Sequence, residues 1–387
     1  MDTIFVSVAS YRDDECPETL NYLFNNADNP HNVHVGICQQ NTEDDIDCIV
    51  NIKNNHKFKN NIRMIRLKHH EAKGPTWARY LCSTLYNNET YFFQIDSHTK
   101  LVQGWDTKCI NMIKSLKASG KSQTPVLSHY PAAWESYKEN DSGTIGVTTG
   151  VTTICKSFFN ERNMISFLGA EFINTHEMQP SPYVAGGFLF CEGRMLKDVP
   201  FDPSLDYLFV GEEILHSIRI WTAGYDIFTP NENIAFHEYT RSEKPKIWTD
   251  KVYTDEEAFQ KVKELIGLEN KKDHLKGYKY NIGAKRTLEE YYSFAGIDLK
   301  NKKVTKNFCR KDLIDDEVTL SNNNEITTQS TQIEHFGNNN DGNDGNKNGI
   351  YKDINILHII VICIIICIFI YITYRYTKDI EVTVIKR

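Results

Sequence analysis

The sequence has no excess of basic residues. Its 387 residues include 44 Lys and Arg against 51 Asp and Glu, which gives a formal net charge of −7. Proteins whose main function is to bind nucleic acid carry a basic surface that neutralises phosphates. The composition therefore predicts no nucleic-acid partner, in a chain long enough for one large hydrophobic core or two small ones.

Cysteine pairs with metal-binding spacing are also absent. None of the ten cysteines forms a Cys-x-x-Cys pair, and several, such as Cys38 and Cys191, stand in strand-like apolar surroundings. Such cysteines are typical of reduced, buried thiols in cytosolic proteins. The pattern predicts neither a structural zinc site nor a disulfide framework. The first residues lack, in addition, the basic region and the apolar run of a secretory signal peptide.

Long hydrophobic runs are absent except near the C-terminus. Residues 356–374 contain no Asp, Glu, Lys or Arg, and as a helix these 19 residues span about 28 Å, enough to cross a bilayer. A buried core helix is the alternative. An Asn- and Gly-rich stretch at residues 313–353, which we expect to be a disordered linker, favours a membrane anchor instead. We predict a transmembrane helix in the lipid bilayer at residues 354–374, and a short basic tail at residues 375–387.

The orientation of this anchor can be argued in two directions. The tail has four basic residues against two acidic ones, and the positive-inside tendency would then place it in the cytosol. The missing signal peptide and the scattered thiols favour the opposite arrangement. We predict a tail-anchored protein with residues 1–350 in the cytosol and the anchor in an internal or virion membrane.

Apolar strands that end in polar residues recur through the N-terminal half. Residues 3–10 form such a strand, followed by a helical pattern at residues 17–26 and by two more strands at residues 33–38 and 61–67. A strand that runs directly into small and polar residues is typical of nucleotide-binding α/β proteins. The alternation predicts a Rossmann-like mixed α/β sheet, mostly parallel and flanked by helices, with ligands at the strand ends.

The next strand, at residues 91–95, is followed by the most informative polar residues. Asp96 and His98 stand two positions apart, so both leave the same face if the strand geometry persists. A carboxylate and an imidazole on one face suit Mn²⁺ or a similar divalent cation, which could hold a diphosphate and neutralise its charge as it leaves. The alternative is a strand-end Asp in a turn beside a surface His, and an Asp-x-His tripeptide alone favours that alternative.

Two residue pairs further along the chain each have a functional and a structural interpretation. Gly186 and Gly187 open a strand at residues 184–190, and they would let a ligand or another backbone come close. Glu212 and Glu213 start a helix, where two acids also interact favourably with the helix dipole.

Two isolated residues complete the set of candidates. Arg79, beside a probable helix, could contact a diphosphate or cap a surface helix, and the residues alone leave both open. His237 follows a short strand-like run. A lone His is usually not a ligand, but the pair Asp96 and His98 lacks a third partner.

Eight blocks of the sequence, in this order between residues 4 and 298, resemble one family. It comprises the cytoplasmic polypeptide α-N-acetylglucosaminyltransferases that modify hydroxyproline, glycosyltransferase family 60. The blocks are residues 4–12, 74–79, 94–98, 199–203, 209–213, 221–226, 237–246 and 283–291.

The resemblance implies a GT-A fold for residues 1–312, a UDP-sugar donor such as UDP-GlcNAc, and Mn²⁺. It also implies a polypeptide acceptor, with transfer to hydroxyproline or Ser/Thr and retention of configuration. The chain is similar, too, to the mucin-type GalNAc transferases, in which an Asp-x-His motif and a distant His bind the metal. Carried over residue by residue, the metal ligands are Asp96, His98 and His237. The donor-binding residues implied in this way are Ala9, Ser10, Tyr11, Arg12, Arg79, Gln94, Gly186 and Gly187, and the catalytic residues are Glu212 and Glu213.

Two other functions are compatible with parts of this pattern. A catalytically silent sugar-nucleotide-binding or structural membrane protein could keep the same fold. A glycosidase with two carboxylates would need no metal, and would leave His98 and His237 without a role. The joint presence of Asp96, these two histidines and the acid pair favours a glycosyltransferase.

Overall fold

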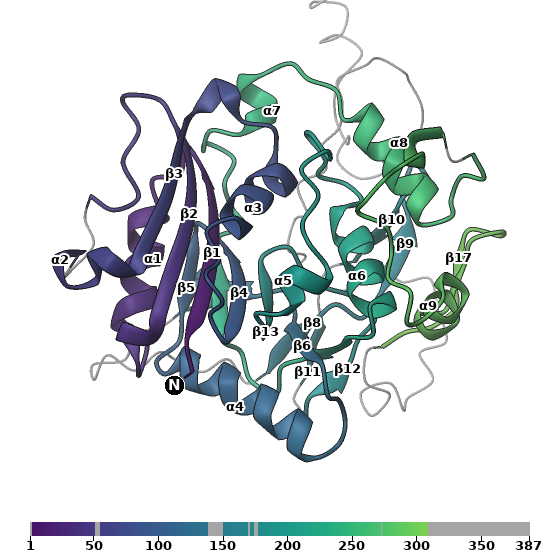
Figure 1. Ribbon diagram of the computed structural model, residues 1–387, viewed down its shortest axis with the longest axis horizontal. Coiled ribbons are helices and arrows are strands. Elements are labelled where there is room, and N and C mark those ends of the chain that lie inside the picture. Colours follow the sequence, from purple (N-terminus) through teal and green to yellow (C-terminus); the bar gives the residue numbers. More distant parts are fainter. Residues whose placement is uncertain are drawn as a thin grey trace, which may run out of the picture. The chain divides into compact units, whose positions relative to one another are not determined.

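The computed structural model describes residues 2–50, 55–137, 150–168, 171–173, 177–271 and 273–308 (Figure 1). The chain divides into two compact units, Met1–Ile333 and Glu334–Arg387, and every described residue belongs to the first. Within the described ranges, no helix is long and apolar enough to cross a membrane. The predicted linker, the transmembrane helix at residues 354–374 and the basic tail lie outside these ranges.

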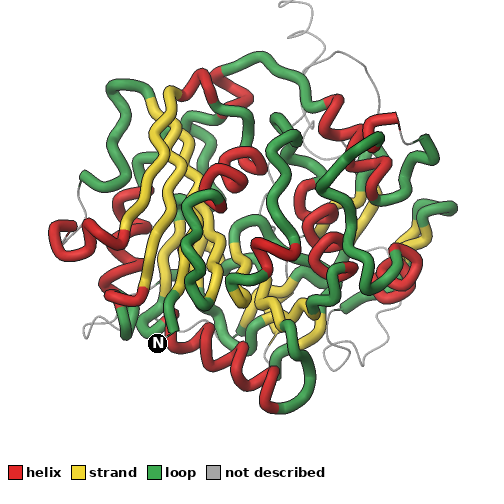
Figure 2. The backbone as a smooth tube through the Cα atoms, in the orientation of Figure 1, coloured by secondary structure: helices red, strands yellow, loops and turns green. Residues whose placement is uncertain are grey.

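The described residues contain an eight-stranded mixed sheet at the centre of the fold (Figure 2). Its strand order is β12-β14-β6-β13-β4-β1-β2-β3. The strands β3, β2, β1 and β4 run parallel to one another, whereas β13 is antiparallel to both of its neighbours. The predicted mixed α/β sheet is therefore confirmed. Its strands are β1 Ile4–Tyr11, β2 Val33–Asn41, β3 Ile62–Lys68, β4 Tyr91–Asp96, β6 Pro125–Ser128, β12 Gln179–Pro180, β13 Phe188–Glu192 and β14 Asp226–Thr229.

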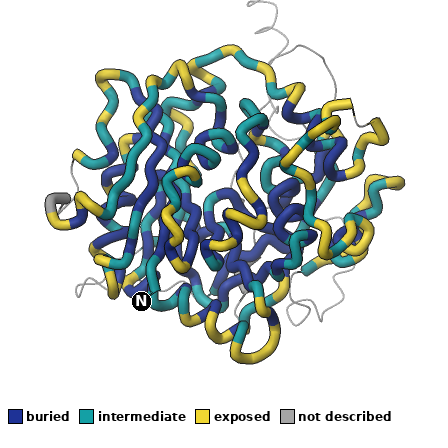
Figure 3. Tube along the Cα trace, viewed as in Figure 1, coloured by how far each residue is buried: buried dark blue, intermediate teal, exposed yellow. Residues whose placement is uncertain are grey.

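Helices cover both faces of this sheet. On one face, Ile4, Val6 and Val8 of β1 pack in a cluster with α1 Cys16–Asn25 and α4 Trp105–Ala118. Buried side chains of the opposite face belong to a second cluster, which includes residues of α5 Met195–Asp198 and α6 Glu212–Thr222. Burial on both faces explains why the central strands are apolar at nearly every position. Figure 3 shows the buried positions gathered along these strands.

A further hydrophobic cluster lies between α6 and two later helices, α8 Glu256–Leu265 and α9 Leu288–Ala295. Helix α3 Pro75–Ser83 packs against strand β2 of the central sheet, and the contact is made by Cys38, Ala78 and Cys82. The shorter elements are α2 Asn55–Phe58, α7 Ile247–Asp250, β5 Thr99–Leu101, β7 Ala132–Ala133, β8 Val151–Thr153, β9 Ser157–Phe159, β10 Ile165–Phe167, β11 Glu171–Ile173, β15 Ala235–His237, β16 Ile297–Asp298 and β17 Lys303–Val304.

The prediction that the cysteines form no disulfide is wrong. Cys16 and Cys48, both fully buried, are joined by a disulfide with their Cα atoms 5.0 Å apart. Cys155 is disulfide-bonded as well, whereas four buried cysteines are free thiols: Cys38, Cys82, Cys109 and Cys191. The first bond forms because β1 and β2 are parallel, so the start of α1 and the loop after β2 reach the same edge of the sheet. The two cysteines are 32 residues apart, and nothing in the local sequence predicts that they meet.

Candidate active site

Three strand ends bring the predicted metal ligands together. Strands β1 and β4 are parallel with Ala9 beside Asp96, so the residues that follow both strands meet at one edge of the sheet. Strand β15 pairs with β5, the strand that follows His98, and places His237 opposite Thr99. One ligand atom from each of Asp96, His98 and His237 lies within 4.8 Å of the other two.

This cluster has the donor chemistry of a divalent-cation site. The set of one carboxylate and two imidazoles suits Mn²⁺ and several related ions. His237 Nε2 lies 3.1 Å from Asp96 Oδ2, and the His98 and His237 rings are 4.5 Å apart. Burial lowers the pKa of His98 to about 4, so the imidazole is neutral and keeps a lone pair for a metal. Burial raises the pKa of Asp96, but the His237 hydrogen bond and Arg79 outweigh it and hold the pKa well below its usual range.

Asp13 orients His98, and it is absent from the residues predicted from the sequence. Its side chain is 2% exposed, and its Oδ2 atom accepts hydrogen bonds from Ser97 Oγ and Arg241 Nη1 (2.9 Å). The same oxygen lies 2.8 Å from His98 Nδ1. A carboxylate on one imidazole nitrogen sets the tautomer and directs the other nitrogen toward a metal. The acidic pair Asp13-Asp14 directly after the first strand was the available signal in the sequence.

We expect Asp13→Ala to lower Mn²⁺ affinity about 10- to 100-fold, the usual effect of losing a carboxylate that orients a metal-binding His. Calorimetric titration with Mn²⁺ measures the change. Asp14→Ala is the matched control, because Asp14 is 50% exposed and pairs only with Lys244 among the contacts described. Equal Mn²⁺ affinity in the Asp13 variant and the parent would contradict this role for Asp13.

Arg79 lies inside the site, so the alternative of a surface helix cap is wrong. Its side chain is 7% exposed, donates to Asp96 Oδ1 at 3.0 Å and also pairs with Glu212. Gly186 and Gly187 make room for this network. A Cβ atom on Gly186 would lie 3.0 Å from the Arg79 guanidinium, and one on Gly187 would lie 2.9 Å from Asp96 Oδ2. The groups that come close to the glycine pair are thus the Arg79, Asp96 and His237 side chains, whereas the prediction named a ligand or another backbone.

Gln94 supports the glycine pair from within the sheet. It is 1% exposed in the middle of β4, and its Nε2 atom donates to the Gly186 carbonyl oxygen at 2.7 Å. The buried Gln94 side chain therefore holds the Gly186 backbone in position.

Glu213 is bonded on both of its carboxylate oxygens. Oε1 accepts from the Gly186 backbone N–H at 2.8 Å, and Oε2 accepts from the Tyr130 hydroxyl at 2.7 Å. Burial, together with the neighbouring Glu212 charge, raises the pKa of Glu213 to about 7. Glu212 and Glu213 in the first turn of α6 therefore both bond to residues at the strand ends. An interaction with the helix dipole alone does not account for these bonds. Nothing in the sequence indicates Tyr130, which comes from a loop 83 residues away.

The shifted carboxyl of Glu213 predicts a pH-dependent stability. Its folded-state pKa is above its ordinary value of 4.5, so the folded protein holds this proton to higher pH than the unfolded chain. The contribution of Glu213 to stability is therefore present at low pH and is lost as the pH rises from about 4.5 to about 7. Glu213→Gln removes the titration and keeps groups that can bond Gly186 and Tyr130.

We expect the stability of Glu213→Gln relative to the parent to improve by about 2 kcal/mol between pH 5 and pH 8. Urea unfolding of both proteins at the two pH values, without metal, measures the difference. Glu289→Gln, an exposed first-turn acid of α9, is the control and should show no such trend. If the unfolding free energies of Glu213→Gln and the parent differ by the same amount at pH 5 and pH 8, the raised pKa of Glu213 is contradicted.

The predicted donor-binding residues at the end of β1, Ala9 to Arg12, lie at the same edge. Ala9 is next to Asp96 in the sheet, and Ser10 is fully buried. Tyr11 and Arg12, both half-buried, bond to other parts of the chain. The Tyr11 hydroxyl and Arg12 Nη1 donate to Asp250 Oδ2 at 2.9 and 2.7 Å, and Arg12 Nε donates to Asp45 at 2.9 Å. The structure thus places all thirteen predicted site residues around one end of the sheet.

The fold and this cluster define an α/β protein with one Asp and two His side chains, which could hold a cation, at the carboxyl ends of its strands. The sequence matches the family Glycosyltransferase (GlcNAc) over residues 3–57 and 51–301. Because the match covers more than half of the chain, the protein belongs to this glycosyltransferase family. Among curated protein sequences, no significant match was found.

Similar folds occur among solved structures. GalNAc-T7 with UDP, GalNAc and Mn²⁺ is similar at a TM-score of 0.51 and 14% identity, over 76% of this chain and 57% of that one. This chain therefore spans little more than half of GalNAc-T7. TarS 1–349 of S. aureus in complex with UDP-GlcNAc gives a TM-score of 0.43 at 14% identity, over 76% of this chain and 70% of that one. The likeness to GalNAc-T7 supports the mixed α/β fold of the described residues.

Proposed function

We propose that the protein is a metal-dependent glycosyltransferase of the GT-A type that moves GlcNAc, or a related sugar, from a UDP-sugar to a hydroxyl of a polypeptide with retention of configuration. The observation that carries the proposal is the convergence of Asp96, His98 and His237 beside Arg79. Family membership supports the sugar, and the similarly folded GalNAc-T7 was solved with UDP, GalNAc and Mn²⁺.

The reaction breaks the bond between the sugar C1 atom and the diphosphate oxygen, and UDP leaves with the electron pair. A new bond joins C1 to the acceptor oxygen, whose proton is released. Asp96, His98 and His237 would hold Mn²⁺, which neutralises charge on the leaving diphosphate when bound. Arg79 adds a fixed positive charge in a largely buried site, where electrostatic interactions are stronger than in water.

The acids of α6 have distinct tasks in this proposal. Glu212 faces Arg79 and would orient the acceptor hydroxyl or the sugar. Glu213 holds the Gly186 backbone and Tyr130, so it shapes the surface against which the sugar lies.

A donor panel tests the proposal directly. The purified full chain is incubated with UDP-GlcNAc, UDP-GalNAc, UDP-glucose and GDP-mannose, with Mn²⁺ or with EDTA, and release of free nucleotide is measured. We expect UDP release from UDP-GlcNAc that requires Mn²⁺, and thermal stabilisation by UDP but not by GDP. Stabilisation by GDP alone would contradict the donor. UDP binding without turnover on any donor or acceptor would support the catalytically silent alternative.

The acceptor is proposed from the resemblance to the hydroxyproline-modifying family. Paired peptides that differ only in hydroxyproline, proline, serine or threonine at one position isolate the hydroxyl that receives the sugar. We expect transfer to the hydroxyproline peptide and none to its proline counterpart. Equal labelling of the two would exclude hydroxyproline as the acceptor.

The membrane anchor at residues 354–374 and the cytosolic location of residues 1–350 are also proposals. Free buried thiols such as Cys38 and Cys82 support a reducing compartment, whereas the Cys16–Cys48 disulfide weighs against one. The sequon Asn88-Glu89-Thr90 reports on this question, because Asn88 is exposed; the second sequon, at Asn140, lies outside the described residues.

We expect no glycan at Asn88 when the full chain is made in eukaryotic cells, and a glycan on a sequon peptide appended after Arg387. Mass spectrometry of both sites gives the orientation. A glycan at Asn88 would show that the N-terminal domain reached the lumen, and would overturn the cytosolic assignment.

A further inference from the structure

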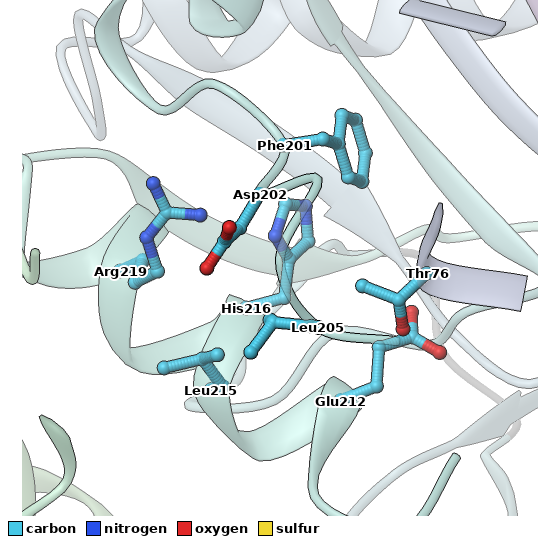
Figure 4. A pocket seen from close by; sticks show the side chains of 8 residues that line it. All are labelled: Thr76, Phe201, Asp202, Leu205, Glu212, Leu215, His216 and Arg219. Atoms are coloured by element: carbon cyan, nitrogen blue, oxygen red, sulfur yellow. The ribbon is translucent and has the colours of Figure 1, made fainter. Parts of the chain in front are cut away.

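A small cavity lies behind the first turn of α6 (Figure 4). Its volume is about 20 Å³, and its walls come from three segments: the start of α3, the loop after α5 and α6 itself. Glu212 lies at its edge beside Thr76, and Asp202, His216 and Arg219 supply the other polar groups. The cavity is thus shared between the candidate site and the interior of the domain.

Two buried polar atoms of residues that line this cavity have no hydrogen-bond partner among the described residues. Asp202 is 2% exposed, and its Oδ1 atom accepts from the backbone N–H and the hydroxyl of Ser204, both at 2.8 Å. The other oxygen, Oδ2, has no hydrogen bond, and neither has Nε2 of His216, which is 7% exposed. In Figure 4 the Asp202 carboxylate lies between the Arg219 guanidinium and the His216 ring.

The surrounding groups hold these two side chains in place. The His216 ring stacks on Phe201 with 5.0 Å between ring centroids. Arg219, which is 4% exposed, donates to the Pro200 carbonyl at 2.8 Å and the Asn281 carbonyl at 3.3 Å. The described contacts include no ion pair between Arg219 and Asp202. Asp202 and His216 therefore line the cavity, and each has one buried polar atom that no described side chain satisfies.

We propose that this cavity binds one ordered water molecule, held by Asp202 Oδ2 and His216 Nε2, and that Asp202 and His216 position Glu212 through the hydrated cluster. A water needs about 10–15 Å³ of such volume and two to four polar partners, and the cavity provides both. The water donates one hydrogen to Asp202 and bonds His216 with its other hydrogen or with a lone pair.

The link to Glu212 follows from the helix. His216 stands four residues after Glu212, one turn further along α6, and both line the same cavity. Burial, with Arg219 and Arg79 nearby, lowers the pKa of His216 to about 3, so the ring is neutral and suited to a hydrogen bond with water. A dry or collapsed cavity would let the first turn of α6 shift and would move Glu212 away from Arg79. The catalytic part of this inference rests on the proposed function.

The water itself is tested by a crystal structure of the protein at a resolution that shows ordered waters. We expect one density peak within hydrogen-bond distance of Asp202 Oδ2 and His216 Nε2. A dry cavity, or a peak with the short distances of a metal cation, overturns the inference. This outcome does not depend on whether the protein transfers a sugar.

The positioning role is tested by a pair of variants at one residue. His216→Leu removes the polar partner, and His216→Gln keeps a group that can bond the water. We expect His216→Leu to lower kcat at least about tenfold with little change in KM for UDP-GlcNAc, and His216→Gln to stay close to the parent. Thermal unfolding of each variant shows whether it is folded.

Equal loss of kcat in the Leu and Gln variants would overturn the positioning role, because a packing defect does not distinguish them. If the Leu variant fails to fold, His216→Phe takes its place, since Phe keeps a ring that can stack on Phe201 and removes the nitrogen that bonds the water. An unchanged kcat in His216→Phe then overturns the role. A parent protein without transfer activity would contradict the proposed function, and the water peak would still decide the binding site.

Discussion

Replacing His237 with alanine is expected to reduce sugar transfer at least about 1000-fold, because the proposed metal would contribute several kcal/mol of charge stabilisation in the transition state. Mn²⁺ affinity is expected to fall more than about 100-fold, beyond the loss for a residue that only orients a ligand. His237 is one of three residues whose ligand atoms lie within 4.8 Å of one another. The His237→Ala variant therefore keeps only Asp96 and His98 as candidate ligands.

Calorimetry with Mn²⁺ and initial rates with UDP-GlcNAc measure the two effects separately. His31→Ala is the matched control, because His31 is an exposed His in a short turn, Pro30–Asn32, outside the cluster. Circular dichroism should show the same folded spectrum for both variants. A His237 variant that binds Mn²⁺ and UDP as tightly as the parent would refute the three-ligand site.

Replacing Arg79 with methionine is expected to destabilise the fold by about 3–5 kcal/mol, the usual cost of leaving a buried charge without its partner. The side chains of Arg79, Asp96 and Glu212 are 7, 25 and 11% exposed, and Arg79 is the cation that contacts both carboxylates. Methionine has a similar length, so the main change is the lost charge and its hydrogen bonds. Transfer activity should fall with it, because Arg79 is also a fixed positive charge next to Asp96 and Glu212.

Urea unfolding without metal measures this loss, and Arg66→Met provides the control. Arg66 pairs with Asp47, but the two side chains are 50 and 36% exposed, so we expect at most about 1 kcal/mol for that variant. Added Mn²⁺ should reduce the difference in unfolding free energy between Arg79→Met and the parent. The reason is that the cation would balance the negative charge of Asp96 in place of the guanidinium. Equal losses in the two Arg variants would contradict a buried network around Arg79.

Much of the site could be predicted from local sequence, because the end of a buried strand is visible as an apolar run that stops at polar residues. The apolar run before Asp96 predicts β4, which ends at Asp96. His98 lies beyond the strand, in the bend before β5, so strand alternation does not place it, and the tertiary fold brings its ligand atom near that of Asp96. The same reasoning at Ser10 and Gln39 predicts polar groups at the carboxyl ends of β1 and β2. Each of these predictions depends on neighbouring residues only.

The sequence by itself determined the mixed α/β class, the strand ends and, through family blocks, the acid, histidine and arginine residues of the site. Tertiary structure alone decided which of these side chains contact one another. Asp13 reaches His98 across 85 positions, and Tyr130 reaches Glu213 across 83, because separate strands and loops end at one edge of the sheet. The Cys16–Cys48 bond has the same origin, since the parallel pairing of β1 and β2 joins segments whose own sequences contain no signal of each other. Local patterns follow from the geometry of one strand or helix, whereas such contacts follow from the order in which strands pair.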